Sequence, residues 1–352
     1  MCIFKKKALI FVLSILMMTT VSCSNTSITP LPNHPPAIAI DFFETSTTQF
    51  LTWPGIYNNK VVYSTYDITN TESRNIFLLD LTNRIEKKIY SVGENKNIAI
   101  EDPKIGPSRV YWVEGIPETW QIKSYNLYDG NIEVIRKSGI KEGATLIPRL
   151  SNEGDLLVWL EGYKDKNGSV NHQIYLYKPE TGIEEITDVN YVENPYDIIK
   201  IKNNSVACVE KLNQNWAVRI IDVNTKYERK VYLDNKPSRP VSDGKVLAWQ
   251  EGDMKKSLYF IKDIDMPNKK KLIAEKIFLF DIFNGDIIYS QSKEKHHLYK
   301  YYSTIDVTTC LTEQVNNNRI YFEFVSAYGD TIVCVYDTLP KPQTLAIIKE
   351  IY

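Results

Sequence analysis

Residues 243–252, DGKVLAWQEG, contain the pattern that decides the fold: a turn-forming pair, a short apolar run and an aromatic residue, Trp249. The same apolar run, ending in an aromatic residue or a cysteine, occurs seven times in the chain. We call the residues that end these runs the anchor residues: Tyr63, Trp112, Trp159, Cys208, Trp249, Tyr289 and Cys334. They are 40 to 49 residues apart, and repeats of this length are typical of β-propellers.

Each repeat has the same internal order of segments. An apolar stretch leads into a turn rich in Asn, Asp and Gly, residues that tolerate the positive φ angles of tight hairpins. The anchor run follows, then a polar loop, a third stretch such as 174–177 and a short fourth such as 184–187. Four short strands with turns between them and no helical period predict one antiparallel propeller blade. We therefore predict an all-β fold, a single seven-bladed β-propeller over residues 37–352.

The seventh repeat has three predicted strands, at 320–326, 331–336 and 343–350. Residues 37–43, AIAIDFF, form a strand-like segment before the first complete repeat. We expect this segment to supply the outer strand of the seventh blade, because such pairing removes an exposed strand edge. The ring is then closed by the two ends of the propeller.

The anchor residues are predicted to fill the space between neighbouring blades. One large side chain per blade at the same depth buries well, and a cysteine there behaves as a small apolar residue. We therefore interpret Cys208 and Cys334 as core residues rather than reactive thiols. Together with Cys310 they are far apart in the sequence and do not predict a disulfide framework.

The first 22 residues are predicted to be an export signal. Three lysines at 5–7 precede an apolar run at 8–18, which is shorter than the roughly 20 residues that a membrane-spanning helix needs. Ser22 followed by Cys23 resembles the lipobox of bacterial lipoproteins. This resemblance implies cleavage before Cys23, lipidation of its thiol, and anchoring on the extracytoplasmic side of a bacterial membrane, at the cell surface or in the periplasm. An ordinary secretory signal is the alternative.

Residues 23–36 are rich in Ser, Thr, Asn and Pro and are predicted to be a flexible tether. The whole chain has 42 Lys and Arg against 43 Asp and Glu, and its first 22 residues contain three of the lysines. The mature form is therefore acidic, which argues against a nucleic-acid-binding protein, because such a protein carries a basic patch or stripe. We expect a monomer with no cofactor.

The repeat is similar to the propellers of the TolB type and of the prolyl-oligopeptidase type. The similarity is carried by Asp243-Gly244 before Trp249 and by the strand Ile174-Tyr175-Leu176-Tyr177. It covers residues 37–352 and implies the fold alone, because a shared fold does not imply a shared function. TolB has six blades and an additional N-terminal domain, whereas this chain predicts seven blades. No hydrolase region follows the repeats, so peptidase activity does not carry over.

No familiar catalytic motif is present. The sequence has no G-x-S-x-G turn, no phosphate-binding loop and no H-E-x-x-H motif. Residues 165–168 begin like a calcium-binding loop but lack its later glutamate, so we predict no metal site. His172, His296 and His297 fall on one predicted face, in blades three and six, and we interpret them as exposed loop residues. The catalytic residues, if any, are unknown from the sequence.

Two sets of residues are candidates for binding a ligand. A glutamate follows four of the anchor residues by two positions, and these four acids would ring one mouth of the channel or simply end their strands at solvent: Glu114, Glu161, Glu210 and Glu251. The innermost strands are predicted to line the channel with further polar residues: Glu101, Asp102, Arg149, Tyr196, Asp197, Arg239, Asp281 and Glu323. Mixed charges with tyrosine suit a small ligand or a peptide loop.

We expect a non-enzymatic binding or scaffold lipoprotein of the cell envelope that presents one propeller face to a protein, a peptide or a glycan. One alternative is a carbohydrate-active lyase or hydrolase with acids at the propeller mouth. Another is a TolB-like envelope-assembly protein, which differs in having a fixed protein partner. An enzyme requires acids, or an acid and a histidine, that converge on one point.

Overall fold

The structure, a computed structural model, describes residues 34–46, 50–67, 70–93, 98–116, 119–138, 147–164, 167–168, 170–192, 199–252, 256–291, 296–315, 321–337 and 343–351. The predicted signal, Cys23 and most of the predicted tether lie outside these residues, as do Tyr196 and Asp197. The account below concerns the unit from His34 onward.

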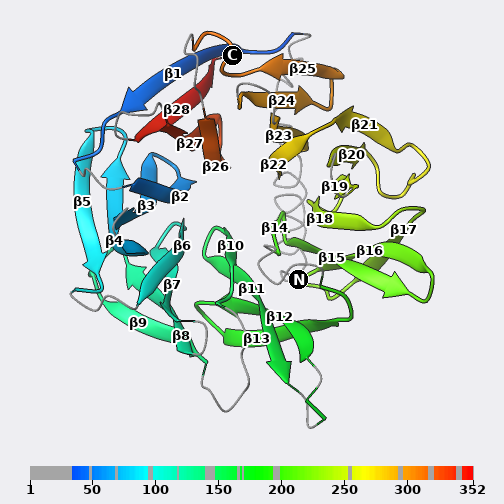
Figure 1. Cartoon of the computed structure of the whole chain (residues 1–352), viewed down its shortest axis with the longest axis horizontal. Coiled ribbons are helices and arrows are strands. Elements are labelled where there is room, and N and C mark those ends of the chain that lie inside the picture. The colour runs from blue at the N-terminus through cyan, green and yellow to red at the C-terminus, as the bar shows by residue number, and fades with distance from the viewer. Residues whose placement is uncertain are drawn as a thin grey trace, which may run out of the picture. The chain divides into compact units, whose positions relative to one another are not determined.

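Seven four-stranded antiparallel sheets form the blades of a closed ring (Figure 1). The innermost strands of blades one to seven are β2 (Phe50–Tyr57), β6 (Ala99–Ile105), β10 (Leu150–Glu153), β14 (Ile201–Lys202), β18 (Pro237–Ser242), β22 (Ile277–Phe283) and β26 (Tyr321–Tyr328). The second strands are β3 (Lys60–Asp67), β7 (Arg109–Ile116), β11 (Leu156–Lys164), β15 (Ser205–Leu212), β19 (Leu247–Glu251), β23 (Asp286–Gln291) and β27 (Thr331–Asp337).

The outer half of each blade follows in chain order. The third strands are β4 (Asn70–Asp80), β8 (Thr119–Asn126), β12 (Val170–Lys178), β16 (Asn215–Asp222), β20 (Ser257–Ile261), β24 (Leu298–Tyr302) and β28 (Thr344–Ile351). The outermost strands are β5 (Ile85–Ser91), β9 (Ile132–Lys137), β13 (Gly182–Val189), β17 (Glu228–Leu233), β21 (Lys271–Ala274), β25 (Val307–Cys310) and, in blade seven, β1 (Ala37–Phe43). The predicted seven-bladed propeller is confirmed.

Strand β1 closes the ring as predicted. It pairs antiparallel with β28, from Ala37 opposite Ile351 to Phe43 opposite Leu345 (Figure 1). Phe43 also enters the apolar cluster between blades seven and one, where it joins Leu51 and Leu345. Closure therefore combines backbone pairing with apolar burial, and it covers an edge of β28 that would otherwise be open.

All seven anchor residues lie on the second strand of their blade and are buried. Four of them stack on the aromatic residue opposite them on the third strand, at near-parallel ring angles of 11° to 24°: Tyr63 on Phe77, Trp159 on Tyr175, Trp249 on Tyr259 and Tyr289 on Tyr299. Such pairs add stability beyond the area that they bury. The repeated motif therefore builds one stacked aromatic layer in most blades.

The cysteines at anchor positions lie in the same layer. Cys208 and Cys334 are buried free thiols, and Cys310 is a free thiol that is half buried. Burial raises the pKa of both the Cys208 and the Cys334 thiol. A raised pKa leaves less of the reactive thiolate, so these two positions suit packing.

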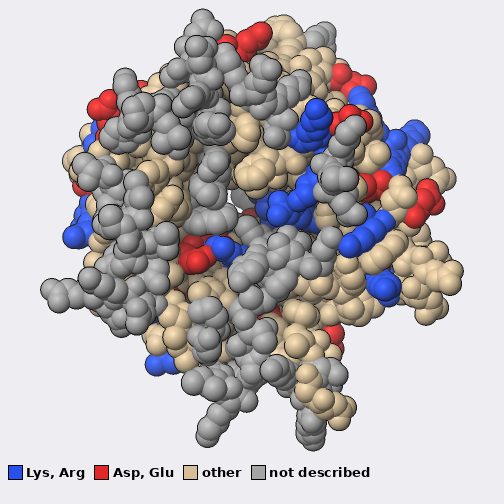
Figure 2. Space-filling model, viewed as in Figure 1, with Lys and Arg blue, Asp and Glu red and all other residues tan. Residues whose placement is uncertain are grey.

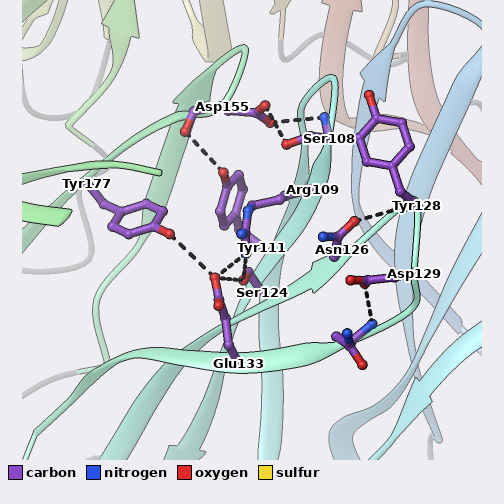
Figure 3. A network of polar contacts seen from close by, with 11 residues as sticks. Ser108, Arg109, Tyr111, Ser124, Asn126, Tyr128, Asp129, Glu133, Asp155 and Tyr177 are labelled. Carbon is purple, nitrogen blue, oxygen red and sulfur yellow. Dashed lines mark hydrogen bonds and ion pairs between the residues drawn. The ribbon is translucent and has the colours of Figure 1, made fainter. Parts of the chain in front are cut away.

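Polar networks join adjacent blades outside the apolar layers. In Figure 3 the turn residue Asp155 of blade three accepts hydrogen bonds from the Ser108 hydroxyl (2.7 Å), and its backbone carbonyl accepts one from the Tyr111 hydroxyl (3.0 Å). Glu133 on β9 accepts hydrogen bonds from Arg109 and, across the interface, from the Tyr177 hydroxyl. The interface between blades two and three therefore has hydrogen-bonding partners at two depths.

The innermost strands are irregular. The pairing register of β6 with β7 shifts between Glu101 and Lys104, and that of β18 with β19 shifts between Ser238 and Val241. Asp102 and Arg239, each followed by proline, adopt positive φ angles of 57° and 50° within these shifts. Bulges of this kind redirect side chains, and strained non-glycine residues cluster at functional sites. Among the described residues, none belongs to a helix long and apolar enough to cross a membrane.

Candidate functional site

Two positions of the repeat, on or next to the innermost strand, line the central channel in most blades. Counting back eight residues from each anchor residue gives one ring of positions: Gly55, Lys104, Ser151, Lys200, Val241, Asp281 and Ser326. Five of the seven line an inner cavity of about 140 Å³, which we call the chamber. Counting back six residues gives a second ring: Tyr57, Gly106, Glu153, Lys202, Asp243, Phe283 and Tyr328. Six of these line a wider cavity of about 790 Å³, which we call the funnel.

The chamber and the funnel meet at a neck. Asn152, Lys202, Asp281 and Ser326 line both cavities, so they mark the junction. The residues belong to blades three, four, six and seven, which shows that the neck lies on the axis of the ring. Lys and Arg side chains gather beside the central opening over blades four to six on the face shown in Figure 2.

Two lysines share one carboxylate at the neck. The Nζ atoms of Lys200 and Lys202 each lie 3.2 Å from Oδ2 of Asp281, and Lys200 also donates to the Phe280 carbonyl at 3.0 Å. The other oxygen of Asp281, Oδ1, accepts the backbone N–H of Ile282 at 2.8 Å. With both lysines protonated, these three groups carry a formal net charge of one positive unit.

The surroundings of the neck change the acidity of its groups. Burial raises the pKa of Asp281, but the two lysines outweigh burial and hold that pKa below its usual range. Burial lowers the pKa of Lys200, and Asp281 only partly opposes the effect. Asp281 is therefore ionised at neutral pH, and Lys200 gives up its proton more readily than an exposed lysine.

The wall of the chamber has an apolar part beside its polar and charged residues. Six of its lining residues are apolar: Pro54, Leu150, Leu279, Phe280, Ile288 and Val325. Lys104 also lines the chamber, but its Nζ is 2.5 Å from Oδ1 of the buried Asp102. The chamber therefore combines apolar walls with a cationic neck.

The funnel has an aromatic side and a charged side. Phe283, Tyr328 and Tyr57 come from the consecutive blades six, seven and one, and the rings of Tyr57 and Tyr328 are 4.5 Å apart between centroids. A hydrogen bond with Tyr328, followed by burial, raises the pKa of Tyr57, so Tyr57 stays protonated at neutral pH. Blades three to five place Glu153, Lys202 and Asp243 on the opposite wall.

Hydrogen bonds between blades hold the charged wall in place. Asn152 donates through Nδ2 to the Ile105 carbonyl at 2.8 Å. The two carboxylate oxygens of Glu153 accept the backbone N–H groups of Asn203 and Asn204, both at 2.8 Å. Blades two, three and four are thus linked at the funnel, and the acid in this wall is already hydrogen-bonded to backbone.

The structure places the predicted channel residues at different locations. Asp281 lies at the neck. Arg149 and Glu101 form an ion pair between blades three and two, and burial raises the pKa of Glu101 although Arg149 opposes it. Asp102 is buried, and its Oδ2 accepts the backbone N–H of Leu150 at 2.5 Å.

Arg239, Asp197 and Glu323 complete the predicted set. Arg239 donates to the Phe278 carbonyl of blade six at 3.5 Å. Asp197 lies outside the described residues, and of Glu323 only the backbone, in β26, is described. The structure therefore brings one predicted residue to the neck, Asp281, and places Glu101, Asp102 and Arg149 in contacts between blades two and three.

The four glutamates two positions after an anchor residue lie in hydrogen-bonded ion pairs. Glu161 accepts from Trp159 Nε1 at 2.7 Å and from Arg136 of the preceding blade at 3.0 and 3.1 Å. Glu251 accepts from Trp249 Nε1 at 2.8 Å and Lys270 Nζ at 2.7 Å.

The other two glutamates follow the same rule. Glu114 pairs with Lys123 at 2.8 Å and accepts a hydrogen bond from Tyr90 of the preceding blade. Glu210 pairs with Lys230 at 2.9 Å. All four carboxylates have side chains no more than 12% exposed, and each has its own basic partner. Their geometry favours the interpretation in which they complete blade packing.

The histidines do not converge. The interpretation of His172 as an exposed loop residue is wrong, because His172 is half buried on β12, and burial lowers the pKa of its imidazole. His297 lies 2.9 Å from the Thr312 hydroxyl, between its Nδ1 and the Thr312 Oγ1. His296 contacts the ring of Phe278. Within the described part of the chain, no group of three or more His, Cys, Asp or Glu is arranged to hold a metal ion.

Sequence reasoning missed Lys104, Lys200 and Lys202 and the aromatic side of the funnel. The signal that finds them is the fixed distance to the anchor residue, eight positions for the chamber and six for the funnel. These positions are two apart on one strand, so their side chains face the same side.

Neither a protein-family model nor a curated protein matches the sequence. Solved structures match the fold. The propeller domain of the Trilobed protease from Pyrococcus furiosus is 13% identical, with a TM-score of 0.61 over 86% of this chain and 95% of that one. Its description states an open velcro topology, whereas here β1 joins β28 and closes the last blade.

Two further matches have different overall lengths. Acylaminoacyl peptidase from Pyrococcus horikoshii is 12% identical, with a TM-score of 0.63 over 88% of this chain, and the match covers 54% of that enzyme. An oligogalacturonate lyase from Vibrio parahaemolyticus is 11% identical, with a TM-score of 0.56 over 90% of this chain and 98% of that one. The chain spans about half the length of the peptidases it matches. It is a seven-bladed propeller similar to those of acylaminoacyl peptidases and oligogalacturonate lyases.

Proposed function

We propose that this protein is a lipid-anchored, non-enzymatic binding protein of the bacterial cell envelope, and that its ligand occupies the funnel. The two-sided funnel carries this proposal. Phe283, Tyr328 and Tyr57 offer an aromatic surface, and the opposite wall offers fixed charges and backbone turns. A concave site with aromatic side chains and a few placed polar groups is the usual form of a ligand site.

The state of the acids supports binding rather than catalysis. A glycan-cleaving enzyme needs two carboxyl groups, or a carboxyl group and a histidine, near one bond of the substrate. Each of the four recurrent glutamates has a basic partner instead. Asp281 is held by Lys200 and Lys202, and Glu153 by two backbone amides.

The ligand class follows from the same surface. The funnel suits a protein loop, a peptide or a glycan, and a TolB-like envelope-assembly protein is the case with one fixed protein partner. We expect the propeller to act as a monomer because its blades close on themselves through β1.

A crosslinking experiment tests the use of the funnel. Lys245 is exposed and lines the funnel, whereas Lys87 is exposed on β5 at the rim. A photoreactive residue at position 245 should crosslink a specific envelope component in cells, and the same residue at position 87 should not. Equal crosslinking at both positions, or none at position 245, contradicts a ligand in the funnel.

The anchor has its own test. Residues 1–23 resemble a lipoprotein signal with its cysteine, and two acyl chains hold a protein stably on a membrane. Cys23→Ser should move the protein from the membrane fraction to the soluble fraction and abolish labelling by radioactive palmitate. Labelling that persists in the variant contradicts lipidation at Cys23.

A lyase acting on acidic sugars is the second candidate. The observation in its favour is a match over nearly the full length of an oligogalacturonate lyase, with no additional domain in that enzyme. Incubation with oligogalacturonate and detection of an unsaturated product by ultraviolet absorbance tests it. Product formation by the wild type would replace the binding proposal.

A further inference from the structure

Among the residues that the structure describes, those at the neck of the channel have more positive than negative charge. Lys200 and Lys202 contact the same oxygen of Asp281, so one carboxylate faces two ammonium groups. The nearby Lys104 is paired separately with Asp102, and Glu153 is occupied by backbone amides. The unbalanced cation therefore belongs to the Lys200 and Lys202 pair.

The position of this charge suits an anionic group that arrives from the funnel. Lys202 and Asp281 line both the funnel and the chamber, so a group that passes the neck meets them first. Charge-assisted hydrogen bonds from ammonium to carboxylate are short and strong, and a partly enclosed site strengthens them. Lys202, with a side chain 27% exposed, is accessible to such a group.

The chamber behind the neck determines which chemical group can lie next to the anionic group of the ligand. Its walls include Pro54, Leu150, Leu279 and Val325, and its volume of about 140 Å³ is far below the 790 Å³ of the funnel. A sugar lying against this apolar part of the wall would leave hydroxyl groups there without hydrogen-bond partners, which costs free energy. An apolar side chain beside a carboxylate meets no such cost. The small volume favours the end of a ligand chain over a chain that continues through the chamber.

We propose that the neck binds the C-terminal carboxylate of a peptide whose last side chain is apolar. Lys200 and Lys202 hold the carboxylate, the last side chain enters the chamber, and the preceding residues lie along Tyr57 and Tyr328 in the funnel. This inference rests on the proposed binding function and specifies its ligand.

Asp281 has a defined role in this arrangement. It occupies the two lysines in the free protein and competes with the incoming carboxylate for them. Binding of the peptide therefore requires the lysines to exchange part of their contact with Asp281 for contact with the ligand. Removing the charge of Asp281 should strengthen binding, whereas removing that of Lys202 should weaken it.

Fluorescence polarisation with three probes tests the inference on the soluble Cys23→Ser protein. The probes are a labelled peptide ending in alanyl-leucine with a free carboxylate, the same peptide with a C-terminal amide, and unlabelled trigalacturonate as a competitor. The free acid should bind at least about tenfold more tightly than the amide, because the amide cannot accept the same charge-assisted hydrogen bonds.

Three variants separate binding from folding. Lys202→Met should weaken the acid peptide about tenfold, Asp281→Asn should tighten it several-fold, and the matched rim variant Lys87→Met should change nothing. A fold defect weakens binding in general, so the gain in Asp281→Asn is the decisive result. Equal affinity for acid and amide, or weaker binding by Asp281→Asn, overturns the inference.

Two other outcomes are decisive. Stronger binding of trigalacturonate than of the peptide assigns the neck to acidic sugars and overturns the peptide. If no probe binds while position 245 still crosslinks a component in cells, the C-terminal carboxylate is wrong and the binding function stands. If the peptide binds in vitro and position 245 crosslinks nothing in cells, carboxylate binding at the neck is supported. The proposal that the funnel binds a component of the cell envelope is then wrong.

Discussion

The charges between the blades and the charges on the channel are balanced differently. Away from the channel, Glu251 accepts hydrogen bonds from Trp249, Lys270 and Asn235 at 2.7 to 3.1 Å. On the channel, Lys200 and Lys202 share a single oxygen of Asp281. The same repeat thus supplies charges that stabilise the fold at one position and charges that remain available for a ligand at another.

The difference follows from what surrounds each position. A glutamate two positions after an anchor residue lies against a neighbouring strand, where a basic side chain or an indole N–H can reach it. A residue eight or six positions before the anchor faces the other blades across a cavity. Changes between the blades should therefore affect stability, and changes on the channel should affect binding.

Among changes to the contacts within and between blades, removal of β1 should reduce stability the most. A protein that starts at residue 44 loses seven backbone pairs with β28 and the side chain of Phe43 from the cluster with Leu51 and Leu345. We expect the melting temperature to fall by about 10 °C or more, measured by circular dichroism. A protein that starts at His34 is the control, because it keeps β1. An unchanged melt in the shorter protein contradicts the role of β1 in closure.

The next largest effect should come from Lys300, which joins blades six and seven. Its Nζ lies 2.8 Å from both carboxylate oxygens of Glu350, and both side chains are 3% exposed. Tyr302 also donates to Glu350 at 2.7 Å. Lys300→Met leaves a buried carboxylate without its cation and should cost about 3 to 5 kcal/mol in unfolding free energy, measured in urea.

The double variant Lys300→Met with Glu350→Leu is the matched control for that prediction. It removes both charges, so most of the lost stability should return. If the single variant costs as little as an exposed ion pair, less than about 1 kcal/mol, the contact between blades six and seven is not the stabilising element that its burial indicates.

The sequence predicts the fold well because its signals are local and repeated. The anchor residues, the Asn- and Gly-rich turns and the segment 37–43 are enough to predict seven blades and the closing strand. Which residues face the channel is harder to predict. Register shifts in β6 and β18 change which side chains point inward, and Asp102 and Arg239 lie within these shifts.

Ion pairs between residues that are far apart in the sequence also cannot be predicted from local sequence patterns. Glu161 is visible as a repeated acid, but its partner Arg136 is 25 residues away and comes from the preceding blade. The lysines at the neck belong to blade four, and Asp281 belongs to blade six. A repeat-based count predicts that both positions line the channel, whereas their pairing requires the closed ring.

A matched pair of charge removals tests the contrast directly. Glu251→Gln should cost about 2 kcal/mol in unfolding free energy, because a buried, charge-assisted set of hydrogen bonds loses its charge. Asp281→Asn should cost less than about 1 kcal/mol, because the Asp281 side chain is 23% exposed whereas that of Glu251 is 6% exposed. Urea unfolding of both variants measures the difference. An Asp281→Asn variant that is the less stable of the two would show that the neck is primarily structural.

The smallest effects should appear as opposite dependences on pH. Burial raises the pKa of Asp286, near Lys300, above its unfolded value of about 3.9, although the Ser303 N–H and Lys300 oppose it. The folded state then binds more protons at acidic pH, so this group costs stability as pH rises through its folded pKa. Asp281 has a lowered pKa, so its contribution is present above about pH 4 and is lost as pH falls through its folded pKa.

Replacement by asparagine removes each titration. Relative to the wild type, Asp286→Asn should therefore be more stable at about pH 7 than at about pH 3, and Asp281→Asn should be less stable at about pH 7 than at about pH 3. Urea unfolding of the three proteins at both pH values measures the two differences. An Asp281→Asn variant that is instead more stable at about pH 7 than at about pH 3, relative to the wild type, would mean that burial controls the Asp281 carboxyl group rather than the two lysines. The cationic character of the neck would then be too weak to hold a ligand carboxylate.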